Sequence, residues 1–217
     1  AMFFLYGAGG NGKGIFLNSI AAIMGDYAKT APMETFTDSK NDRHPTDMAM
    51  LQGARMVFAQ ETESGRAWAE SKIKSLTGGD PISARYMRQD FFTFTPKFKL
   101  LISGNHMPKL KNVDEAMRRR LYLLPFSQIF KGKERDPHLA ETLTREYEGI
   151  LQWIVEGAMT YEDQGLAPPA VVREATRLYF EEEDVFQQWL SECCVQEVDA
   201  YTKPTELFAS YKNFTDM

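Results

Sequence analysis

Cysteine is scarce in this 217-residue chain, and its two cysteines, Cys193 and Cys194, are adjacent. Adjacent cysteines rarely bridge each other and lack the spacing of metal ligands, so we interpret both as reduced thiols in a cytosolic helix. Long apolar runs are also missing, because no run approaches the roughly 18 residues of a membrane span. No signal peptide is recognisable. The sequence therefore predicts no disulfide scaffold, no secretion and no membrane span.

Positive charge is not in excess either, because 25 Lys and Arg are set against 30 Asp and Glu, a formal net charge of −5. This balance argues against a protein coated with charge for nucleic acid, although unevenly placed charges leave room for a local basic surface. The length and the 43% hydrophobic content fit one α/β domain with a small appendage. Because a strand pattern begins at residue 2 or 3 and the last helical pattern stops short, we expect a piece of a longer protein.

Apolar runs of the buried-strand type alternate with helical patterns along the first 126 residues. The predicted strands are residues 2–6, 54–63, 98–105 and 120–126, and the predicted helices are 13–24 and 67–79. Residues 81–87 and 91–96 alternate around a polar turn and predict a hairpin. Residues 27–50 are polar and predict a loop, which leads into a short helix. Strands that alternate with helices predict an α/β fold with a central, mostly parallel sheet flanked by helices.

The chain beyond residue 126 is predicted to be helical. One apolar stripe there predicts a packed helix face: Leu143, Tyr147, Ile150, Leu151, Ile154, Val155 and Ala158. Residues 165–170, GLAPPA, predict a linker before two shorter helices. Asp184 and Gln187 have the spacing of a capping box at the start of the second.

The stretch YGAGGNGKGI, residues 6–15, has the spacing Gly7-x4-Gly12-Lys13 of a phosphate-binding loop, between a strand and a helix. Backbone N–H groups of such a loop cradle phosphates at the helix N-terminus, and Lys13 neutralises the β- and γ-phosphates. The alternative is a tight glycine turn without a ligand. The predicted nucleotide-binding residues are Gly7, Ala8, Gly9, Gly10, Asn11, Gly12, Lys13, Gly14 and Ile15.

Gly14 stands where a Ser or Thr hydroxyl normally binds Mg²⁺. Because Mg²⁺ commonly keeps several waters, a water can take the place of this hydroxyl. We therefore expect weaker binding of the metal and not loss of the nucleotide site.

Polar side chains follow the two strands that come next. Glu61 and Glu63 end the second strand, where a carboxylate can hold Mg²⁺ directly or through water and another can orient the attacking water. We assign the metal to Glu61 and leave open which acid activates the water; the alternative is a solvated strand end. Asn105 ends the third strand, and its amide can hydrogen-bond the γ-phosphate or the lytic water, although Gly-Asn is also a common turn.

Three consecutive arginines, Arg118, Arg119 and Arg120, come just before the fourth strand. A guanidinium fixed beside a neighbour's γ-phosphate is an arginine finger. The alternative is salt bridging to acids such as Asp114 and Glu115. Three arginines need more partners than two acids supply, which favours the finger.

Cations and aromatic residues are interleaved between residues 72 and 99. Cations neutralise a phosphate backbone, and aromatic faces stack on bases, so this segment predicts a contact with single-stranded DNA. The alternative is that the phenylalanines belong to the core and the cations to a solvated face. The cations predicted to bind DNA are Lys74, Arg85, Arg88 and Lys97.

With these pieces in order, the sequence resembles the superfamily 3 helicases, in particular the primase-helicases of phages, plasmids and nucleocytoplasmic viruses. The blocks that carry the resemblance are GAGGNGKG (7–14), MVFAQETESG (56–65), IKSLTGGDPISARYM (73–87), FKLLISGNHMP (98–108) and RRRLYLLPF (118–126). They cover about the first 126 residues. Gly14 and Gln60 depart from the family pattern, which puts the details of metal binding in doubt.

The resemblance implies an AAA+-like P-loop ATPase core that uses ATP and Mg²⁺ and assembles as a ring, commonly a hexamer, around single-stranded or forked DNA. It makes Lys13 the Walker A lysine and Asn105 the motif C sensor. Glu61 and Glu63 match the Walker B region, Arg119 and Arg120 the finger pair that acts in trans, and Lys74 to Arg88 the channel motif.

The resemblance also predicts the setting and the division of the chain. The setting is phage, prophage or plasmid DNA replication in the cytoplasm of a bacterial host, with a primase domain expected upstream. The predicted parts are an ATPase core (1–130), a helical extension (131–165), and a helical linker into a truncated winged-helix region (166–217). Two rival functions remain: a P-loop ATPase of another replication or packaging role, and a nucleotide-binding scaffold that has lost catalysis.

Overall fold

The structure, a computed structural model, describes residues 1–38, 46–60 and 65–216. Within these residues a five-stranded sheet forms the centre in the order β2-β3-β6-β1-β7, and every neighbouring pair in it is parallel. The strands of this sheet are β1 (Met2–Tyr6), β2 (Ala28–Thr30), β3 (Met56–Gln60), β6 (Lys99–Gly104) and β7 (Leu121–Pro125). The predicted α/β fold with a mostly parallel sheet is confirmed, and the loop between β1 and the first helix gives it the P-loop arrangement.

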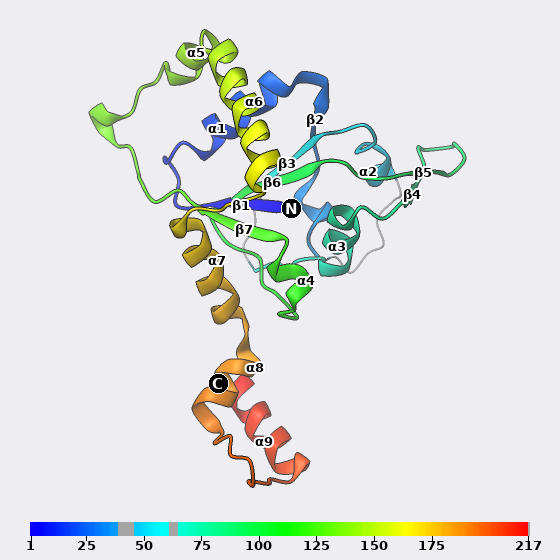
Figure 1. The fold of residues 1–217 in the computed structure, drawn as a ribbon, viewed down its shortest axis with the longest axis vertical. Helices are drawn as coiled ribbons and strands as arrows, with labels where there is room; N and C mark the ends of the chain where they lie inside the picture. Colours follow the sequence, from blue (N-terminus) through cyan, green and yellow to red (C-terminus); the bar gives the residue numbers. More distant parts are fainter. Residues whose placement is uncertain (39–45, 61–64, 217) are drawn as a thin grey trace.

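Helices cover both faces of this sheet, because successive strand side chains point to opposite sides. In β1, Phe4 joins one core cluster and Leu5 the other. The Leu5 side is covered by α1 (Lys13–Met24) and α6 (Tyr147–Gln164), and the Phe4 side by α3 (Glu70–Gly78), α4 (Glu115–Arg118) and α7 (Ala170–Glu183) (Figure 1). None of the helices in the described part of the chain combines the length and apolar character that crossing a membrane requires.

The four predicted strands of the sheet are confirmed, as is the hairpin. The hairpin pairs β4 (Ile82–Ala84) with β5 (Phe92–Phe94) in antiparallel register and projects from the body beside α2 (Thr46–Ala49) (Figure 1). The predicted loop over 27–50 is wrong at its start, because β2 adds a parallel edge strand there. β2 has three residues, Ala-Lys-Thr, and none is buried, so it carries no apolar run that a sequence pattern could detect.

The helical extension contains α5 (Leu139–Thr144) and α6. The predicted packed stripe on α6 is right only in part. Ile150 and Ile154 pack against the cluster around α1, whereas Leu151 is 46% exposed and Val155 is 51% exposed. The helix is apolar on more than one side, so periodicity alone could not show which side meets the body.

The last helices are α7, α8 (Val185–Cys193) and α9 (Pro204–Thr215). α7 packs beside the edge strand β7, where Thr176 Oγ1 accepts a hydrogen bond of 2.9 Å from the backbone N–H of Leu123. The predicted start of α8 is confirmed, because Asp184 Oδ1 accepts from the N–H of Gln187 at 3.1 Å. α8 and α9 form a unit below the α/β body (Figure 1). The boundaries of the three predicted parts stay predictions.

The hydroxyl of Tyr179 anchors α7 to the body. It is buried, accepts a hydrogen bond of 3.0 Å from Trp68 Nε1, and donates one to the carbonyl of Pro108. Burial raises the pKa of Tyr179, which keeps its hydroxyl protonated and able to donate.

We expect Tyr179→Phe to lower the free energy of unfolding by about 1–3 kcal/mol, because it leaves a buried indole N–H and a buried carbonyl without partners. Urea denaturation of both proteins measures this difference. Tyr201→Phe is the matched control, since Tyr201 is 83% exposed. An unchanged denaturation midpoint in the Tyr179 variant would contradict the anchoring role.

Candidate functional site

The carboxyl ends of four parallel strands meet at one edge of the sheet. Tyr6, the last residue of β1, pairs with Gly104 of β6 on one side and with Pro125 of β7 on the other. Gln60 ends β3 one strand further along. In open α/β sheets ligands bind at this edge, where the strand order reverses. The glycine-rich loop, Gln60 and Asn105 are therefore brought to the same place.

Backbone conformation shapes the loop after β1. Gly7 has a φ of +145°, and a Cβ atom there would come within 2.3 Å of the carbonyl oxygen of Phe126. Gly12 occupies the N-cap position of α1 in the left-handed region, with a φ of +87°. Because Gly12 has no side chain, it leaves the N–H groups of the first turn for another acceptor. An anion is favoured there by these donors and by the helix dipole.

Lys13, in the first turn of α1, folds back over the loop. Its ammonium lies 2.6 Å from the carbonyl oxygen of Gly7, 3.1 Å from Asn11 Oδ1 and 3.4 Å from Asn105 Oδ1. Lys13 is 8% exposed, and burial lowers the pKa of its ammonium. The contact with Asn105 joins residues 92 positions apart in the sequence. A cation held by neutral oxygens in this way has no anionic partner among the described residues.

The acids predicted to follow β3, Glu61 and Glu63, lie outside the described residues. Gln60, directly before them, borders the same cleft as Lys13 and Asn105. No group of three His, Cys, Asp or Glu side chains able to hold a metal ion occurs within residues 1–38, 46–60 and 65–216. Mg²⁺ is usually held by one or two carboxylates together with substrate phosphates and waters. On the loop side of the cleft the described side-chain oxygens are the amide oxygens of Gln60 and Asn105, which fit a metal that arrives with a nucleotide.

A cleft of about 610 Å³ opens over the loop, a volume within the range of small-molecule sites. One wall consists of residues 9–15 with Gln60 and Asn105. The opposite wall consists of residues from Phe130 to Ala140, after β7. No sequence pattern indicates this second wall, because the segment has no motif and lies more than a hundred residues from the loop.

The three arginines lie at the amino-terminal ends of the strands, the side of the sheet opposite to the cleft. They precede Leu121, where β7 begins, and the five residues of β7 separate them from the cleft by about 15 Å. This separation exceeds the reach of an arginine side chain, so they do not converge with Lys13 of the same chain. A second copy would have to bring them to a phosphate.

The structure gives these arginines different surroundings. Arg120 donates to Thr77 Oγ1 at 3.1 Å and to the carbonyl of Ala116 at 2.7 Å. Arg118 lies 3.5 Å from Asp184 and stacks over the ring of Phe180 at 5.0 Å. The side chain of Arg119 is exposed and has no partner within the described residues. Arg119 is therefore the arginine left for contacts outside the chain.

The predicted DNA-binding cations fall into two groups. Arg85, Arg88 and Lys97 lie in or next to the hairpin, while Lys74 lies on α3 and pairs with Asp114 and Glu70. Burial alone would raise the pKa of Asp114, but hydrogen bonds from Lys74 and from the N–H of Met117 hold it below its usual range.

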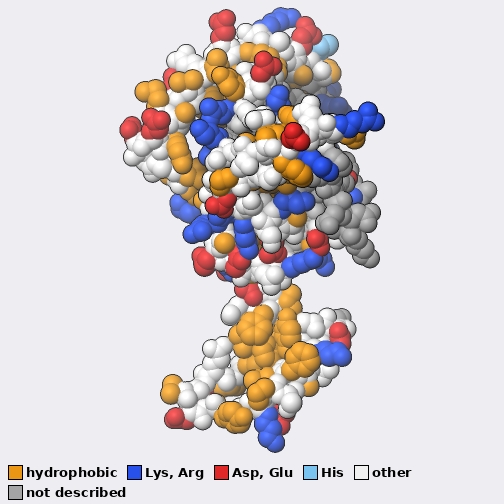
Figure 2. Space-filling model, turned by 90° about the vertical axis from the view of Figure 1, so that its right-hand side faces the viewer, with side chains coloured by type: hydrophobic (Ala, Val, Ile, Leu, Met, Phe, Trp, Pro, Cys, Tyr) orange, Lys and Arg blue, Asp and Glu red, His pale blue; other side chains and the backbone are white. Residues whose placement is uncertain are grey.

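The hairpin tip is an exposed mixture of cations and rings. The guanidinium of Arg85 lies 4.8 Å from the ring centre of Phe91, which is 60% exposed. Arg88 has a φ of +61°, a left-handed conformation that costs roughly 1–2 kcal/mol for a non-glycine residue. Phe98, in contrast, is buried in the core. Lys and Arg side chains are spread over the α/β body in Figure 2.

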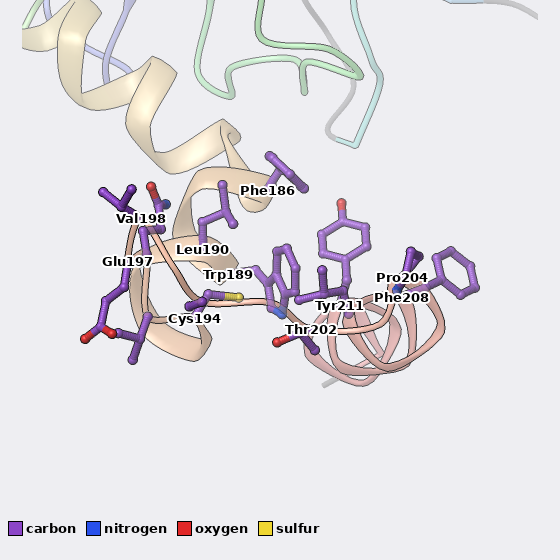
Figure 3. A pocket seen from close by; sticks show the side chains of 14 residues that line it. Phe186, Trp189, Leu190, Cys194, Glu197, Val198, Thr202, Pro204, Phe208 and Tyr211 are labelled. Atoms are coloured by element: carbon purple, nitrogen blue, oxygen red, sulfur yellow. The ribbon is translucent and has the colours of Figure 1, made fainter.

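A second hollow lies in the unit formed by α8 and α9. Its volume is about 790 Å³, and Figure 3 shows Trp189 of α8 beside Tyr211 of α9 among the side chains that line it. Figure 2 shows apolar side chains gathered on this unit. Of the described residues that line the hollow, Glu197 alone is a charged side chain, so we assign no chemistry to it.

Comparison with known proteins finds relatives of this chain in sequence and in structure. The chain is 26% identical over its whole length to the protein named "Putative helicase L207/L206" of Acanthamoeba polyphaga mimivirus. It is 25% identical over 98% of its length to "Putative helicase 022R" of Frog virus 3. It spans 24% of the length of each of these relatives.

Among solved structures, the C-terminal region of NrS-1 in its A form without ligand has a TM-score of 0.60 to this chain, at 11% identity. The match covers 87% of this chain and 44% of the other, and it supports the fold alone. A family match covers residues 5–120, more than half of the chain, from the glycine-rich loop to the arginines. The chain belongs to that family, which is described as a family of unknown function (DUF5906).

Proposed function

We propose that this chain is the ATPase core of a DNA helicase, which binds ATP with Mg²⁺ in the cleft over the glycine-rich loop. One observation carries the proposal: Lys13 Nζ and Asn105 Oδ1 lie 3.4 Å apart at the N-terminus of α1. A γ-phosphate bound beside them would accept from the lysine in place of the neutral oxygens and give it an anionic partner. The helicase names of the viral relatives support the same function.

The chemistry follows from what these side chains can do. Loop N–H groups and Lys13 hold the phosphates, and the amide of Asn105 orients the γ-phosphate or the water that attacks it. Mg²⁺ would be held by phosphate oxygens and by Glu61, directly or through water, and Glu61 or Glu63 would activate the water. Arg119 of a neighbouring copy would complete the site, which requires a ring or another head-to-tail assembly.

Single-stranded DNA would contact the exposed hairpin tip in the channel of that ring. Arg85 and Arg88 supply charge for phosphates, and Phe91 supplies a face for stacking on a base. Opening and closing of the nucleotide site between subunits would move the hairpins and so pull on one strand. This activity would fit a role in DNA replication, with a primase domain upstream in the same polypeptide.

The test is phosphate release by purified protein with Mg-ATP, with and without single-stranded DNA, together with separation of a forked duplex. We expect DNA to stimulate phosphate release. Nucleotide binding without turnover under every DNA condition would instead favour the scaffold. The absence of a hydroxyl at Gly14 is the observation that favours that second candidate.

Restoring the hydroxyl at this position is sterically allowed, because a Cβ atom on Gly14 would meet nothing within 4 Å. We expect Gly14→Ser to lower the Mg²⁺ concentration needed for half-maximal ATP binding by about 2- to 10-fold, the effect of one added polar contact. Titration of ATP binding with Mg²⁺ measures this. Gly14→Ala adds the same Cβ without the hydroxyl and should not shift the curve; equal curves for Ser and Ala would contradict the metal role.

The hairpin is tested by combining Arg85→Ala with Arg88→Ala. We expect weaker binding of single-stranded DNA and a salt dependence reduced by about 1–2 in slope, because two phosphate contacts are lost. ATP binding should be unchanged, since the hairpin does not border the cleft. Lys29→Ala with Arg145→Ala removes two exposed cations elsewhere and serves as the control. Equal DNA affinities in the two double variants would remove the hairpin from the DNA site.

A further inference from the structure

The two ends of the cleft over the glycine-rich loop are lined by different residues, and the strand order of the sheet shows on which side of β1 each end lies. Gln60 ends β3 and Asn105 follows β6, and both strands lie on one side of β1. The segment from Phe130 to Ala140 follows β7, which lies on the other side of β1. A triphosphate whose γ-phosphate reaches Asn105 therefore directs its nucleoside toward the segment after β7.

Two hydrogen bonds attach the chain after β7 to the loop, one at Phe130, where this segment begins, and one at Phe126, four residues before it. The backbone N–H of Phe130 donates to the carbonyl of Gly10 at 3.0 Å. Asn11 Nδ2 donates to the carbonyl of Phe126 at 2.9 Å. Asn11 also accepts from Lys13, so one side chain links this lysine to Phe126, the residue directly after β7. The start of the second wall is thus attached next to the loop, at Phe130.

Two of the three charged side chains with which this wall borders the cleft are carboxylates, and Lys131 and Lys133 of the same segment are not among the described residues that line it. Glu134, Arg135 and Asp136 all border the cleft, and their sum is one negative charge. A triphosphate is favoured at the other end, by Lys13 and the N–H groups of α1. Carboxylates accept hydrogen bonds from hydroxyl and amino groups, which a nucleoside carries. The wall is therefore suited to the uncharged end of a nucleotide.

Phe130 supplies an aromatic surface at this end. It borders the cleft, and 43% of its surface is exposed. No ring contact to Phe130 occurs among the described residues, whereas the ring of the nearby Phe126 packs at a tilt against that of Phe16, with 6.0 Å between ring centres. The ring of Phe130 is thus free to receive another flat group.

We propose that Phe130 is the stacking face for the nucleobase, and that it gives the cleft a preference for purine over pyrimidine nucleoside triphosphates. The larger ring system of a purine covers more of the phenyl face. This inference rests on the proposed nucleotide site and adds the residue that selects the base.

The test compares Kd values of ATP, UTP and inorganic tripolyphosphate, each with Mg²⁺, for the wild type, Phe130→Ala and Phe130→Trp. Stacking on an aromatic side chain contributes about 1–3 kcal/mol per base, so Phe130→Ala should weaken ATP binding about 5- to 140-fold. The affinity for tripolyphosphate should stay within about twofold, and the preference for ATP over UTP should disappear. Phe130→Trp should retain both ATP affinity and preference. Phe208→Ala, which removes a 69% exposed ring on α9, is the matched control.

The outcomes separate the two proposals. Unchanged ATP affinity in Phe130→Ala, or an equal loss for ATP and tripolyphosphate, would overturn the stacking role, because the first shows no contact and the second a general effect on the loop. Equal wild-type affinities for ATP and UTP would overturn the purine preference. Failure of the wild type to bind tripolyphosphate, or binding that Lys13→Ala leaves unchanged, would instead overturn the phosphate site itself.

Discussion

Replacing Lys13 with alanine is expected to weaken the binding of Mg-ATP by about 30- to several-thousand-fold and to abolish phosphate release. The estimate corresponds to the 2–5 kcal/mol lost when one partner of a buried, hydrogen-bonded charge pair is truncated. The effect is large because Lys13 is the cation that borders the loop end of the cleft, among the described residues that line it. Its ammonium already lies within hydrogen-bond distance of the loop and of Asn105.

The fold should survive this change. The Gly7 and Ala8 carbonyls that accept from Lys13 belong to residues that are not fully buried, so water can replace the ammonium there. Lys13→Met keeps the alkyl stem and serves as a second variant. Isothermal titration with ATP and a phosphate-release assay measure the effect, with Lys29→Ala as the control on an exposed lysine. An ATP affinity within twofold of the wild type in both Lys13 variants would show that the cleft is not a phosphate site.

The convergence of Lys13 and Asn105 is the part of the site that sequence reasoning could anticipate. Continuous apolar runs predicted β1 and β6, and parallel strands bring their carboxyl ends to one edge. A glycine-rich loop after one strand and a polar residue after the other must then meet. The prediction depends on both strands being part of one parallel sheet, which their continuous apolar runs indicate.

The second wall of the cleft could not be anticipated in the same way. Its place depends on the hydrogen bond between Phe130 and Gly10, a backbone contact that leaves no side-chain pattern. β2 was missed for a related reason, because its three unburied residues have no apolar signal. On α6, Leu151 and Val155 look as apolar as Ile150 and Ile154, and tertiary contacts alone decide which pair is covered.

The arginines show a third limit of the sequence. Arg118, Arg119 and Arg120 are identical in type and consecutive, so no pattern ranks them. The structure distinguishes them by their contacts. Arg120 donates hydrogen bonds to Thr77 and to the carbonyl of Ala116, whereas Arg119 is exposed. These contacts select Arg119 as the arginine to test as the finger.

We expect Arg119→Ala to reduce ATP hydrolysis by about 10³- to 10⁵-fold, the range measured for arginine fingers, while ATP binding and thermal stability stay close to the wild type. Arg120→Ala is the matched comparison. It should lower the free energy of unfolding by about 1–2 kcal/mol, because it removes hydrogen bonds that join α4 to α3. Calorimetric unfolding and single-turnover hydrolysis separate the two effects.

Mixing variants tests whether Arg119 acts on a neighbouring copy. In a mixture of Lys13→Ala and Arg119→Ala, an interface is intact when the Arg119→Ala copy supplies the loop and the Lys13→Ala copy supplies the arginine. Random head-to-tail assembly at equal concentrations makes about a quarter of the interfaces intact. Hydrolysis in the mixture should therefore rise far above that of either variant alone, to about a quarter of the wild-type rate if sites act independently.

The same mixture without recovery would argue against an arginine supplied in trans, provided that both variants assemble with the wild type. Because β7 separates the arginines from the cleft within one chain, Arg119 cannot reach the cleft of its own chain. A loss of hydrolysis in Arg119→Ala is therefore not explained by an action in cis. A loss of hydrolysis that mixing does not repair would then have to come from assembly. Light scattering of each variant with a non-hydrolysable ATP analogue measures that directly, and a normal assembly mass together with a failed mixture would refute the finger.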